Sequence, residues 1–190
     1  MRPRLAVALT VATALVTSVA ATASASEQAY FKYSATGNLV GIQTSSQVFE
    51  TSKGKTVTCT TATTKGTIED LEATAFVLTV EYSGCSAFGF VSATVSKAEY
   101  EIHADGEVDV LNKIKISVPL GKCEVEVEPQ DGLGTLSYEN KSGKIEEKTA
   151  VTGIESTSTG SLCGTSGSEG KYTGDNLIER EGGGTLEFVA

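Results

Sequence analysis

The stretch EVDVLNKIKISVPLGKCEVEVE, residues 107–128, decides the fold class of this chain. Apolar and polar side chains alternate along it, on both sides of the Pro-Leu-Gly-Lys segment at 119–122. A period of two is the periodicity of a β-strand, whereas a helix repeats every 3.6 residues. The stretch therefore predicts two antiparallel strands joined by a short turn.

The charges fix the register of this hairpin. Pairing Val118 with Cys123 keeps apolar side chains together on one face and sets lysines opposite glutamates on the other. A shift by one residue would break both sets of pairs. The remaining predicted pairs are Ile116 with Val125, Ile114 with Val127, Lys115 with Glu126, and Lys113 with Glu128.

A second hairpin precedes the first. Ala104-Asp105-Gly106 suits a three-residue loop, because glycine tolerates the left-handed backbone that such a loop needs. The pairs would be Ile102 with Val108 and Tyr100 with Val110. We expect residues 107–118 to be one long strand, central to a three-stranded meander over residues 90–128. The apolar phase changes upstream, which predicts a bulge between Lys97 and Glu99.

The rest of the chain repeats this character. Residues 76–82 alternate, the segment 140–143 resembles a hairpin turn, and residues 184–189 are typical of a last strand. Short strands separated by glycine-containing turns favour an all-β antiparallel sandwich or a barrel-like meander. We expect one domain over residues 26–190.

The two halves of that domain share a pattern that hints at an internal duplication, about 35–90 and 100–175. Each half has a cysteine, a Gly-Thr-aliphatic segment, and a second cysteine beside a Gly/Ser loop. The first pair is Cys59 and Cys85, and the second is Cys123 and Cys163. The spacing differs between the halves, so chance similarity among Gly/Thr/Ser-rich strands is the alternative.

The first 25 residues predict a secretory signal peptide. Arg2 and Arg4 precede an uncharged apolar run over residues 5–19, and small-x-small cleavage sites follow, the last ending at Ala25. The run is shorter than the roughly 20 residues of a membrane-spanning helix. We expect a secreted protein, free or associated with the cell envelope, with no transmembrane segment after cleavage.

Four cysteines in an exported chain predict two disulfides, for which three connectivities exist. We favour Cys59–Cys85 and Cys123–Cys163, because each pair then lies within its own half of the chain. The chain has no C-x-x-C spacing, and its single histidine is remote in sequence from every cysteine. A cysteine metal site and redox catalysis are therefore disfavoured.

Composition excludes some partners. With 24 Asp and Glu against 15 Lys and Arg, the formal charge is −9. Nucleic acids and anionic membranes are bound through clustered basic side chains, so we expect neither. A protein or a glycan is the expected partner, although the chain lacks the tryptophans of most glycan platforms. The aromatic side chains that remain as candidates for the surface are Tyr30, Phe31, Tyr33, Tyr138 and Tyr172.

Candidate chemistry is sparse. His103 could serve as a general base or a metal ligand, but an acidic surface neighbourhood is the favoured interpretation. Asp105, Glu107 and Asp109 could line one face of a strand and bind Ca²⁺, yet a solvated acidic face is favoured. Asp131, Asp175 and Asn176 are interpreted as turn formers. We expect no catalytic residue, no metal and no cofactor.

Two sequence motifs are set aside. Gly54-Lys55-Thr56 resembles the end of a phosphate loop, but position 49 is Phe where such a loop has its first glycine. Asn140-Lys141-Ser142 is a formal glycosylation sequon, interpreted as a chance match.

Several segments together resemble a family of small exported actinobacterial β-rich proteins with four cysteines. The similarity covers most of the chain after the signal segment and implies export and a β-rich fold. It implies no activity, ligand or functional residue. The segments are Ala35-Thr36-Gly37-Asn38, Tyr82-Ser83-Gly84-Cys85-Ser86-Ala87-Phe88-Gly89, His103-Ala104-Asp105-Gly106 and Gly170-Lys171-Tyr172-Thr173-Gly174.

Two functions follow as hypotheses. The first is a secreted, non-catalytic β-protein that binds a partner or has a structural role at the cell exterior. The alternative is a small secreted hydrolase that uses acidic residues, with or without Ca²⁺. A deep pocket holding two carboxyl groups of raised pKa would favour the hydrolase, and a filled interior with shallow grooves would favour the non-catalytic protein.

Overall fold

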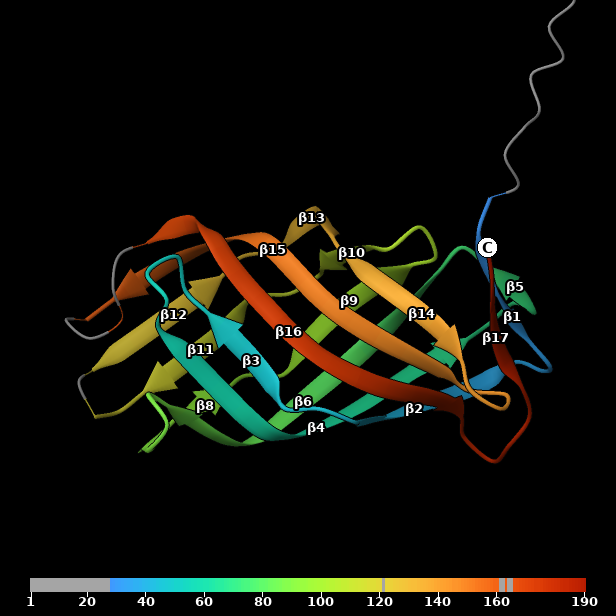
Figure 1. Ribbon diagram of the computed structural model, residues 1–190, viewed down its shortest axis with the longest axis horizontal. Helices are drawn as coiled ribbons and strands as arrows, with labels where there is room; N and C mark the ends of the chain where they lie inside the picture. The colour runs from blue at the N-terminus through green and yellow to red at the C-terminus, as the bar shows by residue number, and fades with distance from the viewer. Residues whose placement is uncertain (1–27, 121, 161–162, 164–165) are drawn as a thin grey trace, which may run out of the picture.

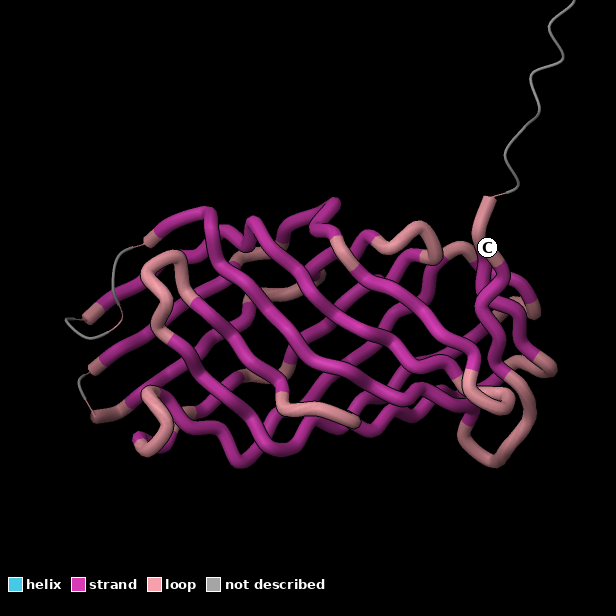
Figure 2. The backbone as a smooth tube through the Cα atoms, in the orientation of Figure 1, coloured by secondary structure: helices cyan, strands magenta, loops and turns pink. Residues whose placement is uncertain are grey.

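The computed structural model describes residues 28–190, apart from 121, 161, 162, 164 and 165. The predicted signal peptide, residues 1–25, lies outside the described residues. Within them every regular element is a β-strand, as the alternating sequence predicts (Figure 2). No helix in the described part of the chain is long and apolar enough to cross a membrane.

Seventeen strands follow one another along the described part of the chain. The first eight are β1 (Tyr30–Tyr33), β2 (Gly37–Gln43), β3 (Gln47–Glu50), β4 (Thr56–Ile68), β5 (Glu72–Ala73), β6 (Ala75–Ala87), β7 (Val91–Ser92) and β8 (Thr94–Val95). The others are β9 (Ala98–His103), β10 (Glu107–Val110), β11 (Ile114–Val118), β12 (Cys123–Val127), β13 (Gln130–Gly134), β14 (Leu136–Asn140), β15 (Ile145–Thr159), β16 (Gly167–Arg180) and β17 (Leu186–Val189).

The large sheet is antiparallel and curls until it closes on itself (Figure 1). At one end the neighbouring strands form a closed ring. Its order is β4, β6, β7, β8, β11, β12, β15, β16, β3 and back to β4. Elsewhere β9, β10, β13 and β14 complete the wall between β6 and β15. The fold is thus the barrel-like form of the predicted architecture, with one face of each strand turned inward.

A three-stranded sheet of β17, β1 and β5 lies at one end of the closed sheet (Figure 1). Phe31 on β1 is 0 % exposed and packs edge-on against Phe76 and Tyr138. Tyr33 is also buried. The assignment of Phe31 and Tyr33 to the surface was therefore wrong, because this small sheet inserts its apolar face into the core.

The charged hairpin has the predicted register. Val118 of β11 faces Cys123 of β12, and the pairs Ile116–Val125, Ile114–Val127 and Lys115–Glu126 follow. The isoleucines and valines are buried, whereas the lysines are exposed and form ion pairs. Lys113 lies 2.6 Å from Glu128, as predicted, and Lys115 reaches the diagonal Glu124 at 2.6 Å.

The predicted long strand is two strands. β10 ends at Val110 and β11 begins at Ile114, and the two pair with different neighbours. Asn112 stabilises the break, since its side chain accepts a hydrogen bond from the Glu99 amide and donates one to the Lys97 carbonyl. The inward phase survives the break, which is why the sequence pattern looked continuous. The expected three-stranded meander over residues 90–128 is consequently absent.

The expected bulge upstream is also a break. β8 ends at Val95 and pairs with β11, whereas β9 begins at Ala98 and pairs with β6 and β10. The change of apolar phase between these strands therefore marks a change of partners. The second predicted hairpin is confirmed, because Ile102 faces Val108 and Tyr100 faces Val110.

Both disulfides are those predicted. Cys59–Cys85 joins directly paired residues of β4 and β6, and Cys123–Cys163 joins β12 to the segment after β15. The four cysteines belong to one apolar cluster near one end of the closed sheet. The first bridge thus ties together two strands of the wall, and the second ties a strand to a connecting segment.

The turn after β14 is confirmed as well. Ser142 and Gly143 both have positive φ, which is the backbone of a two-residue hairpin loop. The side chain of Asn140 does not point freely into solvent. Its amide group donates to the Phe188 carbonyl and accepts from the Phe188 amide, and so links β14 to β17.

Candidate functional site

The closed sheet encloses a cavity of about 50 Å³. Most of its wall is apolar, with aliphatic side chains contributed by the β9–β10 hairpin, by the β11–β12 hairpin, and by β6, β13 and β15. A smaller group of polar and aromatic side chains interrupts this wall. That group comprises Phe49, Thr64, Tyr100, Glu147, Thr149, Tyr172 and Asn176.

Glu147 is an acidic residue whose side chain occupies an inward-facing position. It lies on β15 between Ile145 and Val151, and the alternation of that strand turns all three inward. Glu147 is 4 % exposed. Thr149 donates a hydrogen bond of 2.8 Å to its carboxyl oxygen Oε1.

The burial of Glu147 determines its protonation. Removal from water raises the pKa of the carboxyl group, and the nearby charge of Asp175 raises it further. Hydrogen bonds from Thr149 and Asn176 hold the pKa down in part. The wall therefore carries a carboxyl group that gives up its proton less readily than it would in water.

Thr64 adds a second polar feature to the same wall. It lies on β4, is 2 % exposed, and its hydroxyl Oγ1 has no hydrogen-bond partner among the described residues. A buried hydroxyl without a partner costs about 1–3 kcal/mol. A group that hydrogen-bonds to Thr64 from within the cavity would remove this cost.

A chain of hydroxyl and amide groups crosses the interior beside the cavity. Tyr82 lies 3.0 Å from the hydroxyl of Tyr100 and 3.1 Å from that of Tyr172. Tyr172 donates in turn to Oε1 of Gln47, whose amide nitrogen donates to Asn176 at 3.3 Å. Burial raises the pKa of all three tyrosines, so they remain neutral hydroxyls.

Gln47 fits inside the sheet because Gly174 faces it. The Gln47 side chain is 0 % exposed, and a Cβ atom on Gly174 would lie 1.9 Å from its oxygen Oε1. The glycine thus leaves room for an amide group that would otherwise have no place in the core. This polar network therefore depends on two residues of neighbouring strands, Gln47 on β3 and Gly174 on β16.

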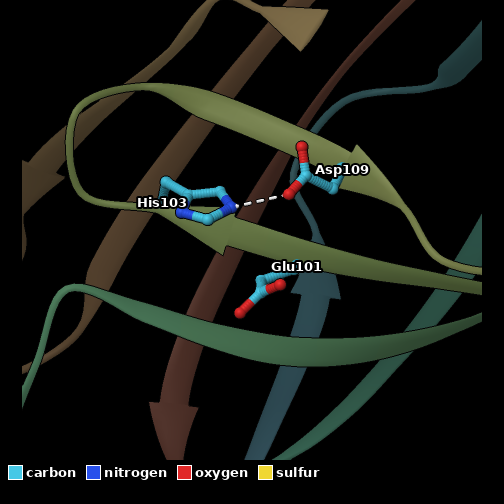
Figure 3. A group of neighbouring side chains, drawn as sticks. All are labelled: Glu101, His103 and Asp109. Carbon is cyan, nitrogen blue, oxygen red and sulfur yellow. Dashed lines mark hydrogen bonds and ion pairs between the residues drawn. The ribbon is translucent and has the colours of Figure 1, made fainter. Parts of the chain in front are cut away.

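A second cluster lies on the outer face of the wall. Glu101 and His103 share the outward phase of β9, and Asp109 faces Glu101 from β10 (Figure 3). Nε2 of His103 lies 3.0 Å from Oδ2 of Asp109, and Oδ1 of Asp109 accepts a 2.6 Å hydrogen bond from the Gly132 amide. The acidic neighbourhood predicted for His103 is confirmed.

This outer cluster has the ligand types of a metal site. One imidazole nitrogen and two carboxylate oxygens lie within 4.8 Å of one another. Such a set suits a borderline divalent ion such as Zn²⁺ better than Ca²⁺, which prefers oxygen ligands alone. All three residues are half-buried, and a histidine–aspartate ion pair accounts for their arrangement without a metal.

The other acidic candidates do not come together in one site. Asp105 lies in the loop between β9 and β10, where its carboxylate accepts a hydrogen bond from the Glu107 amide. Asp131 belongs to β13, and Asp175 and Asn176 belong to β16, so the interpretation of these three residues as turn formers was wrong. Asn176 instead points into the interior, where it contacts Gln47. Asp105, Glu107 and Asp109 do not act as one group.

Sequence reasoning missed Glu147 and Thr64 as site residues, and it placed Tyr172 among surface candidates. A signal for Glu147 existed, since it shares the phase of Ile145 and Val151. Thr64 gave none, because threonine is equally at home on either face of a strand. No family model, curated protein or solved structure matches the chain.

Proposed function

We propose that the protein is exported and non-catalytic, and that it binds a small molecule inside its closed sheet. The observation that carries this proposal is the interior cavity with a partnerless Thr64 hydroxyl and a buried Glu147 carboxyl group in its wall. Binding sites typically combine apolar walls with a few polar groups that orient the ligand.

Two further features support export. The two disulfides suit an oxidising compartment outside the cytoplasm. The basic and apolar start of the chain, followed by small-x-small sites, has the pattern of a secretory signal.

The alternative hydrolase has less support. Glycoside hydrolysis by acidic residues uses two carboxyl groups that flank the bond to be cleaved. Glu147 is the one acidic side chain in the described wall of the cavity. A lone carboxyl group can hold a ligand but cannot serve as both acid and base in that reaction.

The test is to fill the cavity. Val110→Leu and Val127→Ile each add one methylene group to the wall. Binding is measured by ligand-observed NMR with a panel of neutral and charged molecules of up to about five non-hydrogen atoms, the size the cavity admits. Val77→Leu, an exposed position on β6, is the matched control.

We expect at least one molecule of the panel to bind, and the double variant Val110→Leu/Val127→Ile to weaken that binding about tenfold or more. The Val77→Leu control should bind as the parent protein does. The proposal is overturned if no molecule binds the parent protein, or if binding is the same with the cavity filled.

A further inference from the structure

We propose that the ligand of the interior cavity is a small primary ammonium ion, held by Glu147 and by the aromatic rings beside it. This inference rests on the proposed function and names its ligand class. The argument uses the size of the cavity, the charge of its wall and the chemistry of the groups that face it.

Size limits the ligand first. A cavity needs about 10–15 Å³ of free volume for each water that it holds, so the volume of about 50 Å³ admits about three to five non-hydrogen atoms. Methylammonium and ethylammonium fit this volume, and tetramethylammonium, with five non-hydrogen atoms, lies at its limit.

The charge of the cavity wall determines the sign of the charge on the ligand. Glu147 is the one acidic side chain in the described wall, and no Lys or Arg lines that wall. An isolated carboxylate is costly to bury, but a cation in contact with it offsets much of that cost. The ionised form of Glu147 would repel an anion and attract a cation, so the charged ligand that suits this wall is positive.

The aromatic rings suit an ammonium group. Phe49 and Tyr172 both line the cavity, with ring centroids 4.8 Å apart, and Tyr100 lines it as well. The face of an aromatic ring attracts a cation within about 6 Å of its centroid. The charge of Glu147 acts on Tyr100 and Tyr172, where it raises the pKa of both hydroxyls, so the carboxyl group and these rings are close together.

Hydrogen bonding selects a primary ammonium ion. Such an ion has three N–H donors, as a lysine head group does. Glu147 and Thr64 supply acceptors in the wall, and Thr64 Oγ1 has no other partner among the described residues. Ca²⁺ or Mg²⁺ would need six or more oxygen ligands, which this largely apolar wall does not provide.

Binding is coupled to a proton. Burial raises the pKa of Glu147, so the carboxyl group of the empty cavity keeps its proton to a higher pH than in water. Where that proton is bound, entry of RNH₃⁺ releases it to solvent and leaves a carboxylate–ammonium pair, with charge conserved. The groups around Glu147 are the neutral hydroxyls of Thr149, Tyr100, Tyr138 and Tyr172 and the amide of Asn176, while Asp175 adds a nearby negative charge. Binding should weaken as the pH falls.

The experiment compares methylammonium with two probes. Methanol has the same size and no charge, and tetramethylammonium has the charge but no N–H donor. Each is titrated into the intact protein at constant ionic strength by calorimetry, in two buffers of different ionisation enthalpy to count released protons. Glu147→Gln keeps the shape and removes the charge. Glu146→Gln, on the outward face of the same strand, is the matched control.

We expect methylammonium to bind with release of a proton, and tetramethylammonium and methanol to bind at least about tenfold more weakly. Glu147→Gln should weaken methylammonium binding about tenfold or more, whereas Glu146→Gln should change it less than about twofold. Equal binding of methanol, or unchanged binding in Glu147→Gln, would overturn the ammonium ligand and leave the small-molecule site standing. If none of the probes and no molecule of the wider panel binds, the proposed function falls as well.

Discussion

Single residues decide what the interior of this protein can do. Glu147 and Thr64 occupy inward positions in a wall whose other side chains are mostly apolar. Replacing either with an aliphatic residue would preserve the alternation of its strand. Their presence therefore gives the core a chemical specificity that packing alone does not require.

The unsatisfied hydroxyl of Thr64 predicts a gain in stability from its removal. Thr64→Val keeps the branched shape and deletes an unpartnered buried Oγ1, so the ligand-free protein should gain about 1–2 kcal/mol of unfolding free energy. Urea denaturation measures the change. Thr63→Val, at an exposed position of the same strand, should stay within about 0.5 kcal/mol of the parent. A loss of stability in Thr64→Val would mean that the hydroxyl is satisfied inside the cavity.

The raised pKa of Glu147 predicts a pH dependence of stability. A carboxyl group whose pKa is higher in the folded than in the unfolded state binds more protons when folded, so its contribution is greatest below its ordinary pKa of about 4.5. That contribution is lost as the pH rises through the folded-state pKa. Glu147→Gln has no such proton to lose.

Relative to the parent, Glu147→Gln should therefore become more stable as the pH rises from about 4 to about 8. Chemical denaturation of both proteins across this range gives the difference directly. A constant difference would show that Glu147 titrates as it does in the unfolded chain, and a difference of opposite slope would show that an interior positive charge already faces it.

At the scale of elements, pairs of strands joined by short turns were predictable and their partners farther along the chain were not. The hairpin of β11 and β12 follows from the opposite charges of Lys113 and Glu128 and from the apolar pairs behind them. The break at Asn112 does not, because both strands that flank it keep the same inward phase. Strand order depends on long-range pairing, which local alternation does not encode.

The faces of that hairpin predict unequal costs of mutation. Ile116 is buried, so Ile116→Ala should lower the unfolding free energy by about 2–5 kcal/mol. Lys115→Ala removes an exposed ion pair with Glu124 and should cost no more than about 1 kcal/mol. Equilibrium denaturation of both variants checks the order. If the lysine variant proved the more costly, the assignment of inner and outer faces would be wrong.

At the scale of the whole molecule, one end is closed by a small sheet and the other is strengthened by disulfides. Phe31 and Leu186 are fully buried where β1 and β17 meet the core. The cysteine pairing was predictable from sequence because each pair spans a short stretch of chain, 26 and 40 residues. The capping sheet was not, since it joins the start of the described chain to its end.

The disulfides predict a local effect of reduction. Replacing Cys59 and Cys85 together with alanine should cost about 2–5 kcal/mol of unfolding free energy. Hydrogen exchange should accelerate in β11 and β12, which share the apolar cluster of the cysteines, before it does in β1 and β17. Uniform acceleration over the whole sheet would argue instead that the bridge stabilises the fold only through the unfolded chain.

The central claim is that the interior contains a polar-walled site able to take a small ligand. The most direct test is a high-resolution crystal structure of the protein grown with methylammonium. The account predicts compact density beside the Glu147 carboxylate, within hydrogen-bond distance of Thr64 Oγ1 and in contact with the ring of Tyr172 or Phe49. A cavity closed by rearranged side chains, with Glu147 and Thr64 bonded to the protein alone, would contradict it.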